Sequence, residues 1–158
     1  MSEASRETEL LEVHVQRVPV ALWAASQEHF AELMREFTLI AASETTDSPH
    51  PVPQRLLDLV EQLTSSYSGF TTEQERALAE AAEAGVESVD LVFRVPLSAA
   101  QAAETLEQML TEADEFCRSG DHLLTLATPP ECVRYRRWYL EQFVNQAAGL
   151  PPQPWLAG

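Results

Sequence analysis

The chain of 158 residues contains no lysine: each of its ten basic residues is an arginine, against 25 acidic residues. This absence excludes a Schiff-base lysine, a phosphate-loop lysine, a kinase-type catalytic lysine and a Ser-Lys dyad. The formal net charge of −15 repels phosphate backbones and anionic lipid. We therefore expect neither nucleic acid nor a membrane as a partner.

Glycine, cysteine and long apolar runs are also scarce. The five glycines lie far apart, so the sequence has no glycine-rich phosphate loop. Cys117 and Cys132 form no CxxC pair, and we expect two reduced, packed thiols. No apolar run approaches the roughly 20 residues that cross a bilayer, and MSEASRETELLEV carries no signal or transit pattern. These absences predict a soluble, cytoplasmic protein.

What is present predicts one α+β domain over residues 1–150, followed by a Pro-rich tail over residues 151–158. Alternating apolar residues and one short apolar run predict three strands, at 10–18, 89–95 and 123–127. Helical periodicity predicts amphipathic helices over 20–42, 54–66, 71–85 and 97–118, and from Pro130 to about 148. The segment SSYSGF is expected to be a turn, with Thr71 or Thr72 capping the helix after it. The result is a small mixed sheet of about three strands covered by four to five helices.

Two halves of the chain share a pattern. Arg17-Val18-Pro19 recurs as Arg94-Val95-Pro96, and the interval from Pro19 to Pro53 equals that from Pro96 to Pro130. A diverged internal duplication would explain both observations. Convergent use of a strand, a proline and a helix explains them equally well, and the sequence leaves both accounts open.

Groups that could carry chemistry are present but are not arranged for it. None of the four histidines has the HExxH spacing or another spacing that places two ligands on one helix face. The segment ADEFCRSGDH, residues 113–122, is polar, but Asp114 and Glu115 diverge from the face that carries Cys117. We interpret it as a solvated helix end. We therefore assign no catalytic residue, no metal ligand and no cofactor.

The last helix carries the most informative residues. At 3.6 residues per turn, Tyr135 and Tyr139 fall on its apolar arc, and Arg136 falls in the middle of that arc. A half-buried arginine predicts either an internal ion pair or a carboxylate supplied by a partner. Trp138 falls on the polar arc one turn from Arg134, which predicts a cation–π pair on the surface.

Trp and Arg on a surface are typical of binding hot spots. We therefore predict a partner-binding surface that comprises Arg134, Arg137, Trp138 and Trp155. The alternative is that the Pro-rich tail, or another helix, covers this face of the helix.

The segment LATPPECVRYRRWYLEQFV, residues 126–144, resembles the opening strand-Pro-helix of bacterial anti-sigma-factor serine kinases, which have the histidine-kinase-like ATPase fold. FRVPLSAAQAAETLEQML, residues 93–110, matches the same unit more loosely. The whole chain is similar to small acidic actinobacterial regulatory proteins. The ATP site of the kinase family needs a DxGxG motif, which is missing here. The resemblance implies a regulatory setting in which this chain is a noncatalytic component.

Two functions follow as hypotheses. The first is a noncatalytic, cytoplasmic regulatory or scaffolding protein that contacts a protein partner, in bacterial signalling or stress-response regulation; a homodimer is compatible with it. The second is a small-molecule-binding protein or enzyme with a pocket between the sheet and the first helix. Its ligand-binding residues would be Trp23, His29 and Arg136.

Overall fold

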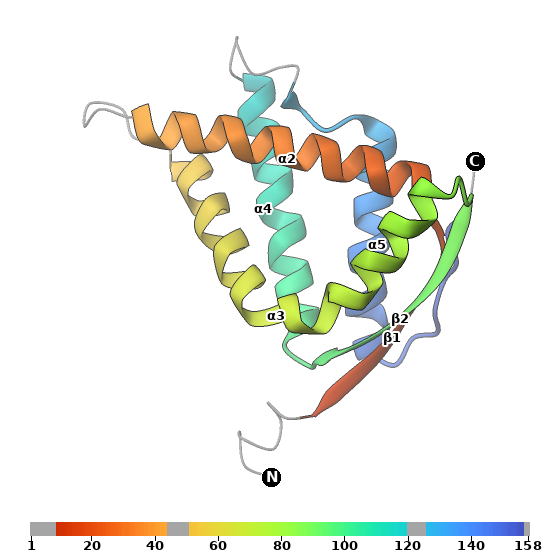
Figure 1. The fold of residues 1–158 in the computed structure, drawn as a ribbon. Helices are drawn as coiled ribbons and strands as arrows, with labels where there is room; N and C mark the ends of the chain where they lie inside the picture. The colour runs from red at the N-terminus through yellow and green to blue at the C-terminus, as the bar shows by residue number, and fades with distance from the viewer. Residues whose placement is uncertain (1–8, 44–50, 120–125, 157–158) are drawn as a thin grey trace.

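The structure is a computed structural model that describes residues 9–43, 51–119 and 126–156. Its elements run strand, helix, helix and then again strand, helix, helix, which confirms the α+β class (Figure 1). They are β1 (Leu10–Pro19), α2 (Val20–Ser43), α3 (Pro51–Glu83), β2 (Ser88–Pro96), α4 (Ala99–Ser119) and α5 (Pro130–Ala147). Within these ranges no helix is both long enough and apolar enough to cross a membrane.

The sheet of the described residues has two antiparallel strands, not a mixed set of three. Val13 lies opposite Phe93 and Val15 opposite Leu91, and all four side chains are buried on the face that packs against the helices. Of the third predicted strand, residues 123–125 lie outside the described ranges. Leu126 and Ala127 are in no strand; they pack against the buried cluster of α2, α3 and α4.

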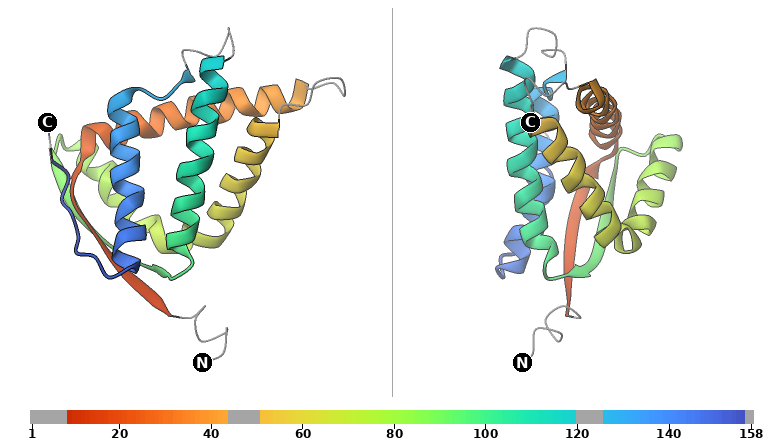
Figure 2. Two further views of the ribbon diagram at one scale, coloured as in Figure 1. Left: turned by 180° about the vertical axis from the view of Figure 1, so that it is seen from behind. Right: turned by 90° about the vertical axis from the view of Figure 1, so that its left-hand side faces the viewer.

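Side chains from two helices cap the outer edges of this sheet. His14 and Val92 lie opposite each other in the ladder. The amide of Gln146 in α5 accepts a hydrogen bond from the His14 N–H and donates one to the His14 carbonyl, both at 2.8 Å. Gln74 in α3 donates to the Val92 carbonyl at 2.7 Å. The strands therefore lie between α5 and the C-terminal part of α3, as Figure 2 shows in its right-hand view. Because these contacts occupy outward-facing backbone groups of both strands, little free edge remains with which a third strand could pair.

Helix α3 is one helix of 33 residues where the sequence predicted two. The segment SSYSGF stays helical, and the hydroxyl of Thr72 donates back to the Ser68 carbonyl at 2.7 Å instead of capping a new helix. Such back-bonding bends helices, and Figure 1 shows α3 changing direction midway. Gly85, with a φ of +71°, follows the helix end as expected, because the left-handed region favours glycine.

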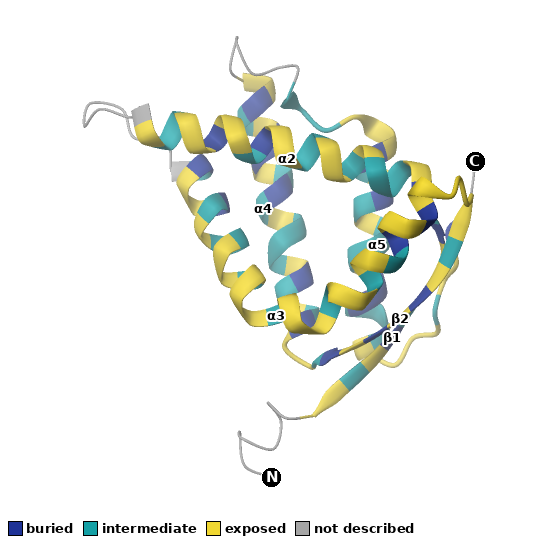
Figure 3. Cartoon of the chain, viewed as in Figure 1, coloured by how far each residue is buried: buried dark blue, intermediate teal, exposed yellow. Residues whose placement is uncertain are grey.

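The core consists of two clusters. One joins both strands to α5, through residues such as Phe93, Tyr135 and Phe143. The other joins α2, α3 and α4, through residues such as Phe37 and Leu56. Figure 3 shows that the buried residues form stripes along the helices, while the remaining faces are exposed. Amphipathic helices that share one interior explain this pattern.

The Pro-rich tail is docked on the body of the protein. Trp155 is 7% exposed, and its N–H donates to the Gln16 carbonyl in β1 at 3.0 Å. Its ring lies 5.3 Å from that of Trp138 and 6.2 Å from that of Tyr135, centroid to centroid. Residues 153–156 thus pack against β1 and α5.

Replacing Trp155 with Ala is expected to lower the free energy of unfolding by about 3 to 5 kcal/mol, since it removes a large buried ring. The neighbouring Leu156 is 75% exposed, and Leu156→Ala should change stability by no more than about 0.5 kcal/mol. Urea denaturation followed by circular dichroism measures both variants. Equal stability of the two variants would contradict the docking of the tail.

Candidate functional site

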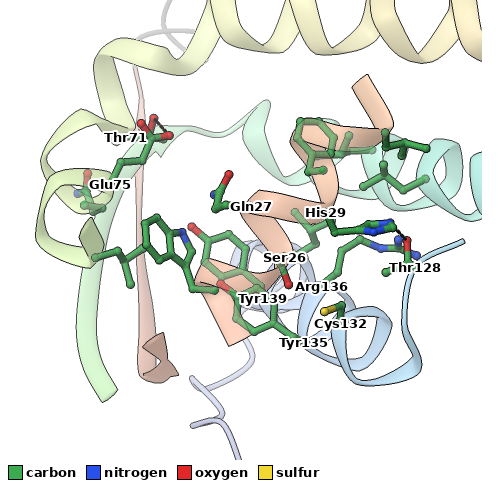
Figure 4. Close-up of a pocket in the computed structure, with 18 of the residues that line it drawn as sticks. Ser26, Gln27, His29, Thr71, Glu75, Thr128, Cys132, Tyr135, Arg136 and Tyr139 are labelled. Atoms are coloured by element: carbon green, nitrogen blue, oxygen red, sulfur yellow. Dashed lines mark hydrogen bonds between the residues drawn. The ribbon is translucent and has the colours of Figure 1, made fainter. Parts of the chain in front are cut away.

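A cavity of about 350 Å³ lies between α2, α3, α4 and α5, with Phe93 of β2 in its wall. Five aromatic rings line it: those of Trp23, Phe30, Phe93, Tyr135 and Tyr139. Figure 4 shows Thr71 and Glu75 at one end of this cavity and His29, Thr128 and Arg136 at the other. A second hollow of about 380 Å³ shares part of this wall and continues along α3 towards Tyr67.

The cavity brings together the three residues that the sequence nominated for ligand binding. Trp23 and His29 line it from α2, and Arg136 lines it from α5. Helical spacing explains the first two, because they are six positions apart and both flank the buried face of α2. The contact between α2 and α5 was not predictable from either helix alone.

Arg136 forms an internal ion pair, which is one of the two outcomes predicted from its position. Its Nε donates to Glu107 at 2.8 Å and its Nη2 to the same carboxylate at 3.3 Å, while Nη1 donates to Asp114 at 3.2 Å. The side chains of Arg136 and Asp114 are 13% and 4% exposed. Two carboxylates therefore offset one guanidinium beside the cavity, and an anionic ligand would meet no excess positive charge there.

Asp114 also connects this ion pair to α2. Its Oδ1 accepts hydrogen bonds from the backbone N–H and the hydroxyl of Thr128, at 3.0 and 2.6 Å. His29 Nε2 lies 3.3 Å from that hydroxyl. Because the hydroxyl proton is donated to Asp114, the histidine must be the donor in this contact.

The prediction that Asp114 lies at a solvated helix end is wrong. Asp114 is 3% exposed and lies among the buried residues of α4. Asp114 lies four residues after Leu110 and three before Cys117, and this spacing would have placed it on the core face of the helix.

Among the described residues, no group of three or more His, Cys, Asp or Glu side chains could hold a metal ion.

Burial moves the pKa of three titratable groups near this site further above neutral pH. Burial is the largest cause that raises the pKa of Tyr139 and of Tyr135 far above their usual range. Burial, with Asp114 nearby, raises the pKa of Cys117 to about 11. At neutral pH these groups are therefore hydroxyls and a thiol, so they do not act as bases or thiolate nucleophiles.

Two buried oxygens in residues that line the cavity have no hydrogen-bond partner among the described residues. They are Oγ of Ser26 and Oε1 of Gln74. Gln146, which caps the opposite edge of the sheet, uses both ends of its amide on His14, whereas Gln74 uses one end on Val92. An unpaired buried polar group costs about 1 to 3 kcal/mol, so such groups often mark a binding site.

The residues predicted to form a partner-binding surface lie together, but the tail occupies part of that surface. Trp138 is half-buried and donates from Nε1 to the Gln153 carbonyl at 2.8 Å. The guanidinium of Arg134 lies 4.7 Å from the ring centroid of Trp155, the ring that packs against Trp138. Arg137 is exposed and donates to Glu107 at 3.2 Å.

The sequence signal for the docked tail was the combination of Pro-rich spacing and a terminal tryptophan. It could not identify the residues that the tail contacts, because the acceptor Gln16 and the donor Trp138 lie outside the tail in the sequence. Comparison of the chain with protein-family models, with curated proteins and with solved structures gives no match.

Replacing Arg136 with Ala should lower the free energy of unfolding by about 3 to 5 kcal/mol, because it leaves two carboxylates without their buried cation. Arg137 on the same helix bonds the same Glu107 from an exposed position. Arg137→Ala is a matched control and should cost at most about 1 kcal/mol. Urea denaturation at pH 7 measures the difference, and equal losses would mean that the Arg136 ion pair has no special role in stability.

Proposed function

We propose that this chain is a small-molecule-binding protein whose site is the cavity between α2 and α5. The observation that carries the proposal is the convergence of Trp23, His29 and Arg136 on one space of about 350 Å³. This volume is at the small end of the range in which proteins hold organic ligands. Apolar and aromatic walls with a few placed polar groups are the usual composition of such sites.

The polar groups of the cavity favour binding over catalysis. Arg136 is held by two carboxylates, and His29 contacts the hydroxyl of Thr128. The buried tyrosines keep their protons, because burial raises their pKa. A general base needs a pKa near the working pH and a free path to the substrate. We therefore propose a ligand that is held without chemical change.

The position of the tail also favours the cavity over a protein-contact function. Trp138 and Trp155, two of the four residues expected to contact a partner, pack against each other. Hot-spot residues contribute most when a partner desolvates them. The tail has already removed much of the surface of these two rings from solvent.

The proposal predicts that small organic molecules raise the melting temperature and that filling the cavity abolishes this effect. Ser26→Leu places a larger apolar side chain in the wall and removes the unpaired hydroxyl, so ligand affinity should fall at least about tenfold. Ala25 is exposed on the same helix. Ala25→Leu adds the same side chain on the solvent side and should retain the ligand effect.

A thermal-shift screen with small aromatic and aliphatic alcohols, amines and acids supplies the measurement, with isothermal titration calorimetry on the molecules that respond. A flat response of the unmodified protein to the whole panel would overturn the proposal. A shift of the same size in the Ser26→Leu variant would mean that the molecules bind elsewhere.

Contact with a protein partner is the second candidate function. A shallow hollow formed by Arg134, Trp138 and residues 153–156 supports it, with Leu156 75% exposed beside the stacked Arg134 and Trp155. The resemblance of residues 126–144 to anti-sigma-factor kinases would place such a partner in bacterial regulation.

The double variant Arg134→Ala, Leu156→Ala tests the second candidate, because both side chains are exposed. We expect the specific capture of one purified regulatory partner to fall at least about tenfold while the urea midpoint stays unchanged. Glu141 is exposed on the same helix, and Glu141→Ala serves as the control. Undiminished capture by the double variant would exclude this surface.

We also infer that the two strand-helix-helix halves derive from a duplicated unit. The repeated order of elements supports this inference, as does the equivalent use of Gln74 and Gln146 at opposite edges of the sheet.

A further inference from the structure

The two ends of the cavity differ in charge. Among the described residues that line it, Arg136 and the titratable His29 lie at the same end (Figure 4). The guanidinium there is already balanced by Glu107 and Asp114. At the other end α3 contributes the exposed carboxylate of Glu75, which accepts a long hydrogen bond of 3.4 Å from Thr71 of the same helix. The unbalanced charge of the cavity is therefore negative.

Aromatic rings form much of the wall between these ends. Trp23, Phe30, Phe93 and Tyr139 line the same space as Glu75. The faces of such rings carry partial negative charge and attract ammonium groups, which is how proteins recognise amines with aromatic cages. Glu75 is also close enough to Tyr139 to contribute, after burial and Tyr135, to the raised pKa of that phenol. The aromatic rings and the carboxylate of Glu75 therefore line the same part of the cavity.

The unpaired oxygens call for a hydrogen-bond donor. Oε1 of Gln74 is an acceptor next to Glu75 in α3, and no described group donates to it. An ammonium group brings three donors and no acceptor, an alcohol brings one donor, and a carboxylate brings none. The overall charge of −15 would also raise the local concentration of cations.

We infer that the ligand is an organic amine, bound with its ammonium group beside Glu75 and the amide oxygen of Gln74, and with its apolar body between the rings of Trp23 and Tyr139. This inference rests on the proposed function, since it names the class of ligand that the same cavity takes.

Three molecules with the same phenylethyl body test it: phenethylamine, phenethyl alcohol and hydrocinnamate, which end in an ammonium, a hydroxyl and a carboxylate. Isothermal titration calorimetry on the full chain at pH 7 and low salt measures each dissociation constant. The amine should bind about tenfold more tightly than the alcohol, and the carboxylate should bind most weakly. Added salt should reduce the advantage of the amine.

Glu75→Gln provides the matched variant. It keeps the shape and removes the charge, so the affinity for phenethylamine should fall about tenfold while that for the alcohol stays the same. Glu80 is exposed on the same helix and does not line the cavity. Glu80→Gln changes the net charge equally and should leave both affinities unchanged.

The outcomes separate this inference from the proposed function. Equal binding of amine and alcohol, or an amine affinity that Glu75→Gln does not alter, overturns the choice of an amine and leaves the cavity as a binding site. Tighter binding of the carboxylate also overturns it and assigns the head group to the end that holds Arg136. If none of the three molecules binds, the choice of an amine is overturned, and the proposed function fails as well only if the whole thermal-shift panel gives a flat response.

Discussion

A sheet of two strands has two open edges and too little surface to be stable by itself, so the remaining structure must supply both cover and edge partners. In this protein the glutamine amides of α3 and α5 bond the outer edges, and the backbone of Trp155 extends the cap on β1. The need to bond both outer edges of the sheet fixes where α3 and α5 lie. Because the second helix of each half caps the strand of the other half, neither half could be completed without the other.

The position of α5 in turn determines where Arg136 lies. Helix α5 is bonded to β1 and also packs against α4, and Arg136 meets Glu107 and Asp114 at the contact with α4. Breaking a buried ion pair by removing one partner is costly. The pair therefore links α4 to α5, and through Thr128 it reaches His29 in α2. These polar contacts link α2, α4 and α5, and mainly apolar and aromatic side chains line the space beside them.

That space is the cavity, and its composition follows from the same arrangement. The rings of Tyr135 and Tyr139 belong both to the packing over the strands and to the cavity wall. Trp138, one residue before Tyr139, instead turns to the tail. Helix α5 thus lines the cavity with Tyr135 and Tyr139 and contacts the C-terminal segment with Trp138. The two candidate functions therefore occupy separate faces of α5 and can be tested by separate substitutions.

The sequence by itself determined the α+β class, both described strands, the core faces of most helices and the need of Arg136 for a carboxylate, whereas the structure showed that this carboxylate is internal. Each of these depends on local periodicity or on the cost of burying a charge, which a single segment reveals. Only the tertiary structure decided that α3 is one bent helix, that Asp114 is buried, that Arg134 lies over Trp155, and that Trp23, His29 and Arg136 share a cavity. Those outcomes depend on contacts between residues far apart in the chain, whose partners the local pattern of hydrophobic and polar residues does not specify.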